Sequence, residues 1–502
     1  MSHPATARRA AARSADMPRA LLRAAPFVIA ALAVTVTALH RLPAILPFQW
    51  AMLRWPFPMQ GSESLIVWEA HLLAEGKSIY VANTPDQHGF ISGPYTPLYF
   101  VAVAATLKLT PTIYTGGRVI AFCAWLLLIA TVAALTLAAT RRRSAWLGAL
   151  VAAVSLAVFS PGVIWAVRVK PTIPALALAA FGLLVVQLTW NASRPYYLWA
   201  LPFFIAGYFT KQTTLAAASA AMLFLLVRLG PRAGLRFVGV GALGGAAPFA
   251  LLTLATRGEF LRHIVTDRRL AWQFQLVRNF GGLFLRDYWP LLVAALVAAV
   301  ALAWARVPTI APYYLLTALV ITPVTIGVEG ADHDHLIELA AAAALVVGAG
   351  LAAALTGRAL PVLAAWPVAA LLVAQVVTGW TPDRWYAGEL TVPSPQVRLQ
   401  LERIVTNIRG TPGDVLAEEV GLPLLAGKPV PYDDPQAMAA LARVGRWDEQ
   451  QLLDDLNQRR FSLVVLPANP RDELWTPEVL AAIHANYTLK FRDVWFTWEA
   501  KR

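Results

Sequence analysis

Apolar segments of membrane-spanning length recur through residues 1–380 of this chain. An α-helix needs about 20 mostly apolar residues to cross a bilayer, and every backbone amide there must bond within the segment. Hydrophobic residues make up 58% of the chain and charged residues only 14%, whereas soluble domains carry about 25% charged residues. We therefore predict a polytopic α-helical membrane protein with about eleven spans, at residues 26–46, 117–140, 145–164, 173–190, 196–210, 213–229, 234–255, 288–306, 311–328, 336–356 and 360–380.

Charged residues on the two sides of these spans differ in sign. Cytoplasmic loops of membrane proteins carry an excess of Lys and Arg. With the N-terminus inside, the run Arg141–Arg143 and the loops at Arg194 and Arg232 face the cytoplasm, where Asp16 is the only acid. This pattern predicts a cytoplasmic basic N-terminus (1–25), a membrane domain (26–380) with an outer loop (47–116), and an extracytoplasmic C-terminal region. We expect the protein in the inner, or plasma, membrane.

The net charge of +13 arises in the membrane part, because residues 381–502 hold more acids than bases. Loop topology and contact with anionic membrane lipid account for part of such an excess, and we expect no nucleic-acid partner. Phosphate-loop, nucleophile-elbow, HExxH and CxxC motifs are absent from the sequence. Their absence argues against an ATP-driven transporter or a zinc protease.

The composition becomes that of a soluble domain after residue 380. Two short apolar segments, 414–417 and 461–466, predict strands, and the stretch 434–459 between them predicts a helix. This order indicates a C-terminal extracytoplasmic α/β domain (381–502) with a sheet that is at least partly parallel. Residues 430–434 are a further candidate extended segment. We expect the domain to cover the membrane part rather than to catalyse on its own.

Glu63 lies in the outer loop, at the start of a predicted amphipathic helix that runs to Glu75. On one helix Glu63 and Glu69 would point to different faces, so they do not form a carboxylate pair. Glu63 is therefore either a reactive carboxylate, which makes it the candidate general base, or a helix-start residue stabilised by the helix dipole.

Basic residues also gather on the predicted outer side, where topology does not call for them. Each one alone would pass for an interfacial anchor. As a set they predict a site for an anionic, phosphate-bearing ligand, with Arg118, Arg168, Lys170 and Lys211 as candidates.

A polar segment, ADHDHLIE, opens the tenth predicted span. Asp334 and Glu338 are spaced four residues apart, and His335 and Glu338 three, so each pair would share a helix face. The segment is a substrate-facing rim, an ordinary solvated loop or a site for a divalent cation. No cofactor is certain. The candidate substrate-binding residues here are Asp332, His333, His335 and Glu338.

Several short motifs resemble, in their order and membrane side, those of the GT-C superfamily of polytopic glycosyltransferases. The similarity is greatest to the bacterial glycosyltransferase 39 and aminoarabinose-transferase-like group. The motifs are SE-x(12)-G-x(2)-IY from Ser62 to Tyr80, GPYTPLYF at 93–100, GGR at 116–118, YFTKQT at 208–213, HDHLIEL at 333–339 and AEEVGLPLLAGK at 417–428.

The resemblance implies transfer of a sugar from a polyprenyl-phosphate donor to an envelope glycan, lipid or protein acceptor outside the membrane, with an outer-loop carboxylate near the reaction centre. The chain departs from this pattern twice. Ser62 stands where relatives carry a second acid, which puts a metal requirement in doubt. Lys170 stands where they carry Asp, which indicates a different phosphate grip or a site that has diverged from catalysis.

A membrane glycosyltransferase is therefore the leading prediction. Glu63 would take the acceptor's proton, cations would stabilise the leaving phosphate, and Tyr95 would stack on a sugar face or sit in the interfacial aromatic belt. The alternatives are a transporter or flippase of a lipid-linked or anionic substrate, and a non-catalytic scaffold of envelope assembly.

Overall fold

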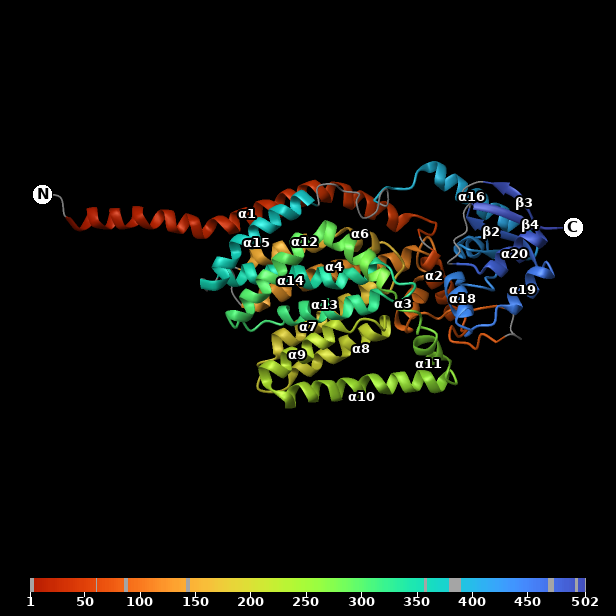
Figure 1. Cartoon of the computed structure of the whole chain (residues 1–502), viewed down its shortest axis with the longest axis horizontal. Helices are drawn as coiled ribbons and strands as arrows, with labels where there is room; N and C mark the ends of the chain where they lie inside the picture. The colour runs from red at the N-terminus through yellow and green to blue at the C-terminus, as the bar shows by residue number, and fades with distance from the viewer. Residues whose placement is uncertain are drawn as a thin grey trace.

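The computed structural model describes residues 4–59, 61–84, 89–140, 145–355, 359–378, 390–467, 474–492 and 495–501. A bundle of apolar helices carries a small α/β domain at one end (Figure 1). The bundle helices are α1 (Pro4–Arg54), α4 (Thr115–Thr140), α5 (Trp146–Ala157), α7 (Thr172–Thr189), α8 (Leu201–Thr210), α9 (Ala216–Leu229), α10 (Pro231–Ala255), α12 (Phe274–Trp304), α13 (Ala311–Ile326), α14 (Leu336–Leu355) and α15 (Ala359–Thr378).

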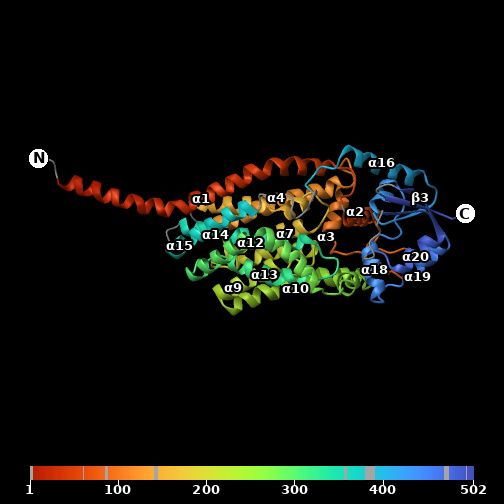
Figure 2. The ribbon, with the colours of Figure 1, turned by 45° about the horizontal axis from the view of Figure 1, so that its top comes forward.

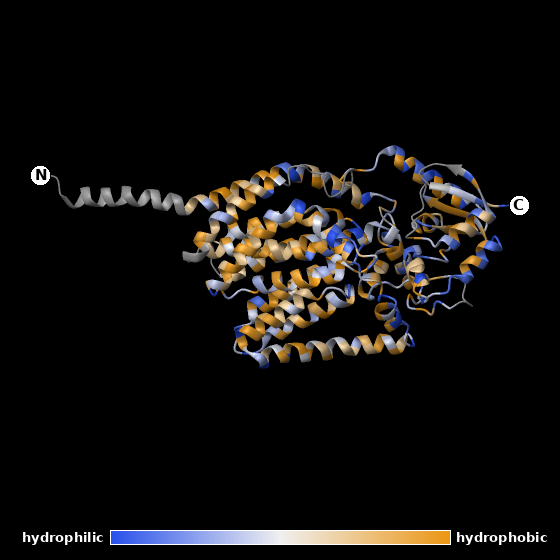
Figure 3. Ribbon diagram, viewed as in Figure 1, coloured by the Kyte–Doolittle hydropathy of each residue, from blue (hydrophilic) through white to orange (hydrophobic). Residues whose placement is uncertain are grey.

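Each predicted span overlaps one of these helices, so the predicted fold class is confirmed. Within the described ranges, six helices are long and apolar enough to cross a membrane by length and composition, and four others are apolar but shorter. Hydrophobic residues predominate along the bundle helices, while hydrophilic ones are more frequent toward the end that carries the C-terminal domain (Figure 3).

Helix α14 forms the centre of the bundle and is almost entirely buried. It is rich in Ala and Gly, and small residues let neighbouring helices approach closely inside a membrane. The contact with α5 shows this, since a Cβ added at Gly148 would lie 2.3 Å from the carbonyl oxygen of Gly348. Helix α10 is the opposite case, because it lies at the edge of the bundle with little buried surface.

Short helices of the loops cluster at the end beside the C-terminal domain (Figure 2). They are α2 (Gly61–Ala74), α3 (Leu98–Thr106), α6 (Ser160–Trp165), η2 (Tyr196–Ala200), α11 (Glu259–Leu261), η3 (Arg262–Thr266) and η4 (His333–His335). η2 is the exception, since it leads into α8 at the far end of the bundle. The first predicted span was too short, because its helix continues to Arg54.

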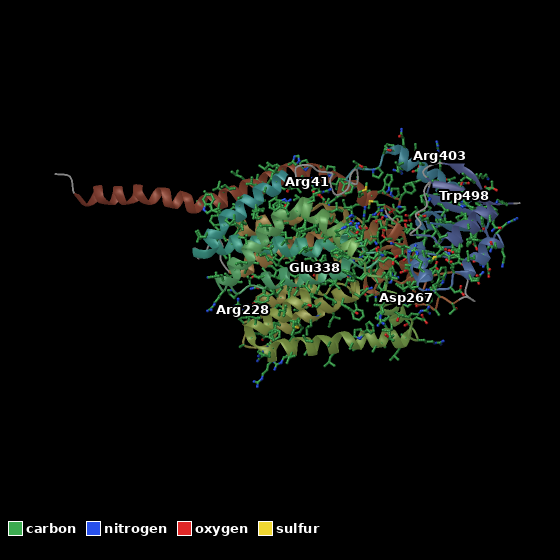
Figure 4. All side chains as sticks on the ribbon, in the orientation of Figure 1. Arg41, Arg228, Asp267, Glu338, Arg403 and Trp498 are labelled. Carbon is green, nitrogen blue, oxygen red and sulfur yellow. The ribbon has the colours of Figure 1, made fainter. Side chains whose placement is uncertain are left out.

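Two charged residues of the loops lie at opposite ends of the bundle. Figure 4 shows Arg228 at the end where α9 turns into α10, and Asp267 at the other end beside the C-terminal domain. The run Arg141–Arg143 lies outside the described residues.

The C-terminal region contains α16 (Pro395–Gly410), β1 (Asp414–Ala417), α17 (Gly421–Leu425), α18 (Pro435–Arg443), α19 (Gln450–Asn457), β2 (Phe461–Pro467), α20 (Pro477–Asn486), β3 (Tyr487–Arg492) and β4 (Trp495–Ala500). The sheet order is β1-β2-β4-β3, and β1 pairs with β2 in parallel, as predicted. The single helix predicted over 434–459 is two helices, because Gly445 takes a positive φ of 66° between them. The strands β3 and β4 were not predicted.

Candidate active site

Glu63 and Arg118 form an ion pair that is fully buried. The Nε and Nη2 atoms of Arg118 donate to the two carboxylate oxygens at 2.7 and 2.8 Å. The same oxygens accept the backbone N–H groups of Met59 (2.9 Å) and Val169 (2.8 Å). Burial raises the pKa of Glu63, but the charge and hydrogen bonds of Arg118 outweigh it and hold the pKa below its usual value. Glu63 is therefore a charged carboxylate whose two oxygens are both occupied.

The hydrogen-bond donors of Arg118 are occupied in the same way. Its Nη1 and Nη2 atoms also donate to the carbonyl oxygens of Met52, Trp55 and Phe57, at the end of α1 and just beyond it. The pair thus ties α1, α2, α4 and the turn at Val169 together. This geometry does not support the prediction that Glu63 takes a proton and Arg118 binds a phosphate, because neither side chain reaches an open surface.

Lys211 follows α8 and forms a second buried ion pair, with Asp334. Its Nζ atom lies 2.7 Å from Asp334 Oδ2 and donates to Thr172 Oγ1 at 2.7 Å. Thr172 also donates to Asp334. These contacts use two of the three N–H bonds of Lys211, which leaves a third for a ligand.

Lys170 and Arg168 lie in the turn between α6 and α7. Lys170 Nζ lies 5.5 Å from the ring of Trp165 and 6.0 Å from that of Tyr95, and Arg168 lies 5.0 Å from Trp165. Lys211 lies 5.9 Å from Tyr95, so this ring is near two of the cations. Burial lowers the pKa of Lys170 to about 8, and the nearby charge of Asp334 opposes the change. Arg168, Lys170 and Lys211 are called the cationic cluster below.

The residues of the polar segment before α14 do not lie together. Some lie near the cationic cluster, and Glu338 lies inside the bundle. Asp332 caps η4, and although burial raises its pKa, contact with His333 holds the pKa below the usual value. The charge of Asp332 acts on both Lys170 and Tyr95. His335 is largely buried near Lys211. Glu338 lies inside the bundle, where it accepts a hydrogen bond from Tyr314 at 3.3 Å (Figure 4). The predicted shared face therefore does not form one site.

A metal site is not evident in the part of the chain that the structure describes, since no three His, Cys, Asp or Glu side chains come together there as ligands.

Sequence reasoning missed a group of acids at the contact between the outer loop and the C-terminal domain. Glu69, Asp433 and Glu419 are buried there, with Asp434 and Arg268 beside them. Sequence spacing offered no signal, because Glu69 and Asp433 are far apart in the chain.

An apolar cavity of about 560 Å³ opens between α8, α9 and α10. Tyr208, Phe209, Thr214 and Leu215, which flank Lys211 in the sequence, contribute to its wall together with Gly245 of α10. The cavity and the cationic cluster are thus joined by one short segment of chain.

No family model and no curated protein matches the sequence. Among solved structures, ArnT from Cupriavidus metallidurans in the apo state has a TM-score of 0.58 at 12% identity, over 91% of this chain and 96% of ArnT. The same protein bound to undecaprenyl phosphate has a TM-score of 0.58 at 13% identity, over 91% and 96%. ArnT, an aminoarabinose transferase, is a GT-C glycosyltransferase. At this identity the likeness is one of fold, and it confirms the predicted resemblance: the chain has the GT-C fold.

Proposed function

We propose that this protein is a membrane glycosyltransferase that takes a sugar from a polyprenyl-phosphate donor and transfers it to an acceptor at the bundle end that carries the C-terminal domain. One observation carries the proposal: the segment from Tyr208 to Leu215 supplies Lys211 to the cationic cluster and also contributes to the wall of an apolar cavity. A lipid phosphate has the same two parts, an anionic head and an apolar chain.

The cluster is suited to the leaving phosphate. Loss of the sugar leaves negative charge on the phosphate oxygens, and fixed cations in a water-poor site stabilise that charge strongly. Lys170 and Lys211 both lie near the ring of Tyr95, and all three cations are largely buried. The sugar would lie against the rings of Tyr95 and Trp165, which contact these cations.

Asp332 replaces Glu63 in this proposal as the group that takes the acceptor's proton. Its side chain is 27% exposed, whereas that of Glu63 is 0% exposed. Contact with His333 keeps its pKa low, so it is a carboxylate at neutral pH. Its charge acts on Lys170, which places it near the cationic cluster.

The ArnT structure with undecaprenyl phosphate supports the choice of donor, because a protein of this fold holds a lipid phosphate. The sugar is not specified by the residues described above.

The test uses purified protein in lipid nanodiscs with a panel of radiolabelled polyprenyl-phosphate sugars. We expect slow hydrolysis or transfer with one donor, reduced about 100-fold in Lys170→Ala. The matched control is Lys108→Ala, which removes an exposed lysine of the same outer surface.

Absence of turnover with every donor, from protein shown to be folded, would contradict the proposal. Flux of donor across proteoliposomes in that case would favour the transporter, and absence of flux the scaffold.

A further inference from the structure

The C-terminal domain meets the outer loop through a short parallel bridge between Phe90 and Tyr432. Phe90 N–H donates to the Pro431 carbonyl oxygen at 2.7 Å, and Asp433 N–H donates to the Phe90 carbonyl oxygen at 3.2 Å. The Phe90 ring is buried against Trp447, with the ring centroids 5.2 Å apart. The domain is thus held to the membrane part by backbone hydrogen bonds and an aromatic contact.

Two carboxyl groups meet beside this bridge, Glu69 of α2 and Asp433 of the domain. Gly93 N–H donates to Glu69 Oε1 at 2.7 Å, and Ser92 N–H donates to Asp433 Oδ1 at 3.0 Å. The remaining oxygens, Glu69 Oε2 and Asp433 Oδ2, are buried and receive no donor from the described residues. The two carboxyl groups are close enough to interact directly, and one proton shared between them would give both of these oxygens a partner.

The surroundings favour this proton. Burial raises the pKa of both groups well above the usual value, and the nearby carboxylate of Asp434 raises it further. Arg268 opposes this effect on Glu69 and donates to Ser92 Oγ at 2.9 Å. The other titratable groups that face this contact are Tyr80, whose pKa is raised by burial and by the nearby charge of Glu69, and His263, whose ring nitrogens contact the carbonyl oxygens of Ser92 and Val81.

The loop that Glu69 holds leads directly to the cationic cluster. Gly93 has a φ of 47° and is closely surrounded, since an added Cβ would lie 2.6 Å from Nδ1 of His263. Tyr80 donates to the Tyr95 carbonyl oxygen at 2.7 Å, and Gln212 donates to the Pro94 carbonyl oxygen at 2.9 Å. The segment from Ser92 to Tyr95 therefore joins the domain contact to the ring that lies near Lys170 and Lys211.

We propose that a proton shared by Glu69 and Asp433 holds the C-terminal domain on the outer loop and, through the segment from Ser92 to Tyr95, positions Tyr95 in the cationic cluster. Glu69 and Asp433 are positioning residues in this scheme. The role of Tyr95 in catalysis rests on the proposed function. The docking of the domain does not depend on it.

The direction of the pH effect follows from linkage. A carboxyl group of the undocked domain has an ordinary pKa of about 4, whereas that of the docked pair is raised. Docking is therefore strongest below about pH 4 and weakens about tenfold per pH unit as the pH rises toward the raised pKa of the pair.

A second buried carboxyl group of the domain acts in the same direction. Glu419 hydrogen-bonds Ser64 of α2, and burial raises its pKa to about 7. Glu63, Glu418 and Tyr114 are the charged or titratable groups near it. Glu419→Gln removes the contribution of Glu419 to the pH dependence of docking. The effect of Glu69→Gln on docking is therefore measured in that background as well.

The test measures docking by Förster transfer between dyes on Lys108→Cys and Gln450→Cys, in full-length protein with Cys123→Ala, in nanodiscs from pH 5 to 9.5. We expect the open fraction to rise about tenfold per pH unit over part of this range. In Glu69→Gln the amide oxygen can accept from Gly93 and the amide N–H can donate to Asp433, so the pair no longer needs a proton. We expect the open fraction of this variant not to rise with pH in this way. Asp433→Asn gives a second variant with the same expectation.

The matched control is Glu75→Gln, an exposed acid just after α2 that pairs with Lys77 and should keep the wild-type profile. A wild-type open fraction that is constant with pH, or an unchanged slope in both Glu69→Gln and Asp433→Asn, would overturn the proposal. Sugar transfer is measured on the same samples. Transfer that persists unchanged while the domain opens refutes the positioning of Tyr95, whereas absence of transfer at every pH refutes the proposed function and leaves the docking result standing.

Discussion

The charge of Lys170 is sensitive to pH, because burial lowers its pKa to about 8. A lowered lysine pKa means that the cation is complete below pH 8 and is lost as the pH rises through 8. Arginine at the same place would stay charged at every pH of interest. The anion-binding strength of the site therefore depends on pH through this one side chain.

The prediction is that kcat/KM for a polyprenyl-phosphate donor falls by up to about tenfold per pH unit above pH 8, since this parameter follows the free enzyme. Lys170→Arg should remove this fall. Steady-state rates between pH 6.5 and 9.5 measure it, with Lys108→Arg as the control, and the difference between the two profiles isolates Lys170. Identical profiles for the wild type and Lys170→Arg would contradict the assignment.

Glu63 should matter for stability rather than for proton transfer. Removing one partner of a buried ion pair costs about 3–5 kcal/mol, because the other charge remains buried and unpaired. Glu63→Gln is expected to lower the apparent Tm of the purified protein by several degrees, whereas the exposed Glu75→Gln should not. A variant with the wild-type Tm and abolished transfer would instead restore Glu63 as the general base.

The sequence identified Glu63, Arg118 and Lys211 as notable charges, because acids are scarce in such a chain and topology does not call for bases on the predicted outer side. It did not reveal their partners. Glu63 meets Arg118 and Val169, and Lys211 meets Asp334, only after helices distant in the chain have packed. The reactive and the structural carboxylate look alike in sequence, and burial separates them.

Whole elements were more predictable than contacts, because an apolar run of given length has few alternatives to a helix. The runs that became α4 and α10 show this. Boundaries failed where a helix continues beyond the predicted span, as at the end of α1, which runs to Arg54, and at the start of α12, which begins at Phe274 rather than at the predicted 288. The strands β3 and β4 were missed because β3 directly follows α20 and no turn signal separates them.

The glycines of α10 allow a direct test of the apolar cavity. Gly245 lines the cavity, and a Cβ added there meets nothing within 4 Å. Gly245→Leu should fill part of the space without disturbing the helix, because leucine is a better helix former than glycine. We expect the KM for the lipid donor to rise about tenfold, from the loss of roughly 1.4 kcal/mol of binding.

Gly239→Leu is the matched control for this prediction. Gly239 lies on the same helix, is equally open, and is not among the residues that line the cavity. An equal rise of KM in both variants would show that the effect comes from α10 in general and not from the cavity.

At the scale of the whole molecule, the outer-loop helices, the cationic cluster and the C-terminal domain share one end of the bundle, and Arg228 lies at the other. The charge pattern of the loops predicted this separation from sequence. The contact between the domain and the outer loop could not be predicted, because Phe90 and Tyr432 form a single isolated bridge.

The orientation in the membrane gives a further prediction. In a Cys123→Ala background, Gln450→Cys should react with a membrane-impermeant maleimide on intact spheroplasts, and Arg232→Cys should react only after the membrane is opened. Both side chains are exposed, so access alone decides the result. The reverse pattern of labelling would place the C-terminal domain in the cytoplasm.

The buried pair of Glu63 and Arg118 also constrains how the protein is made. Glu63 is synthesised 55 residues before Arg118, which at about 5–20 residues per second corresponds to roughly 3 to 11 seconds. The Val169 amide emerges later still. Throughout that interval the carboxylate must stay hydrated at the membrane surface, so the outer loop can close on α4 only after the second span has been inserted.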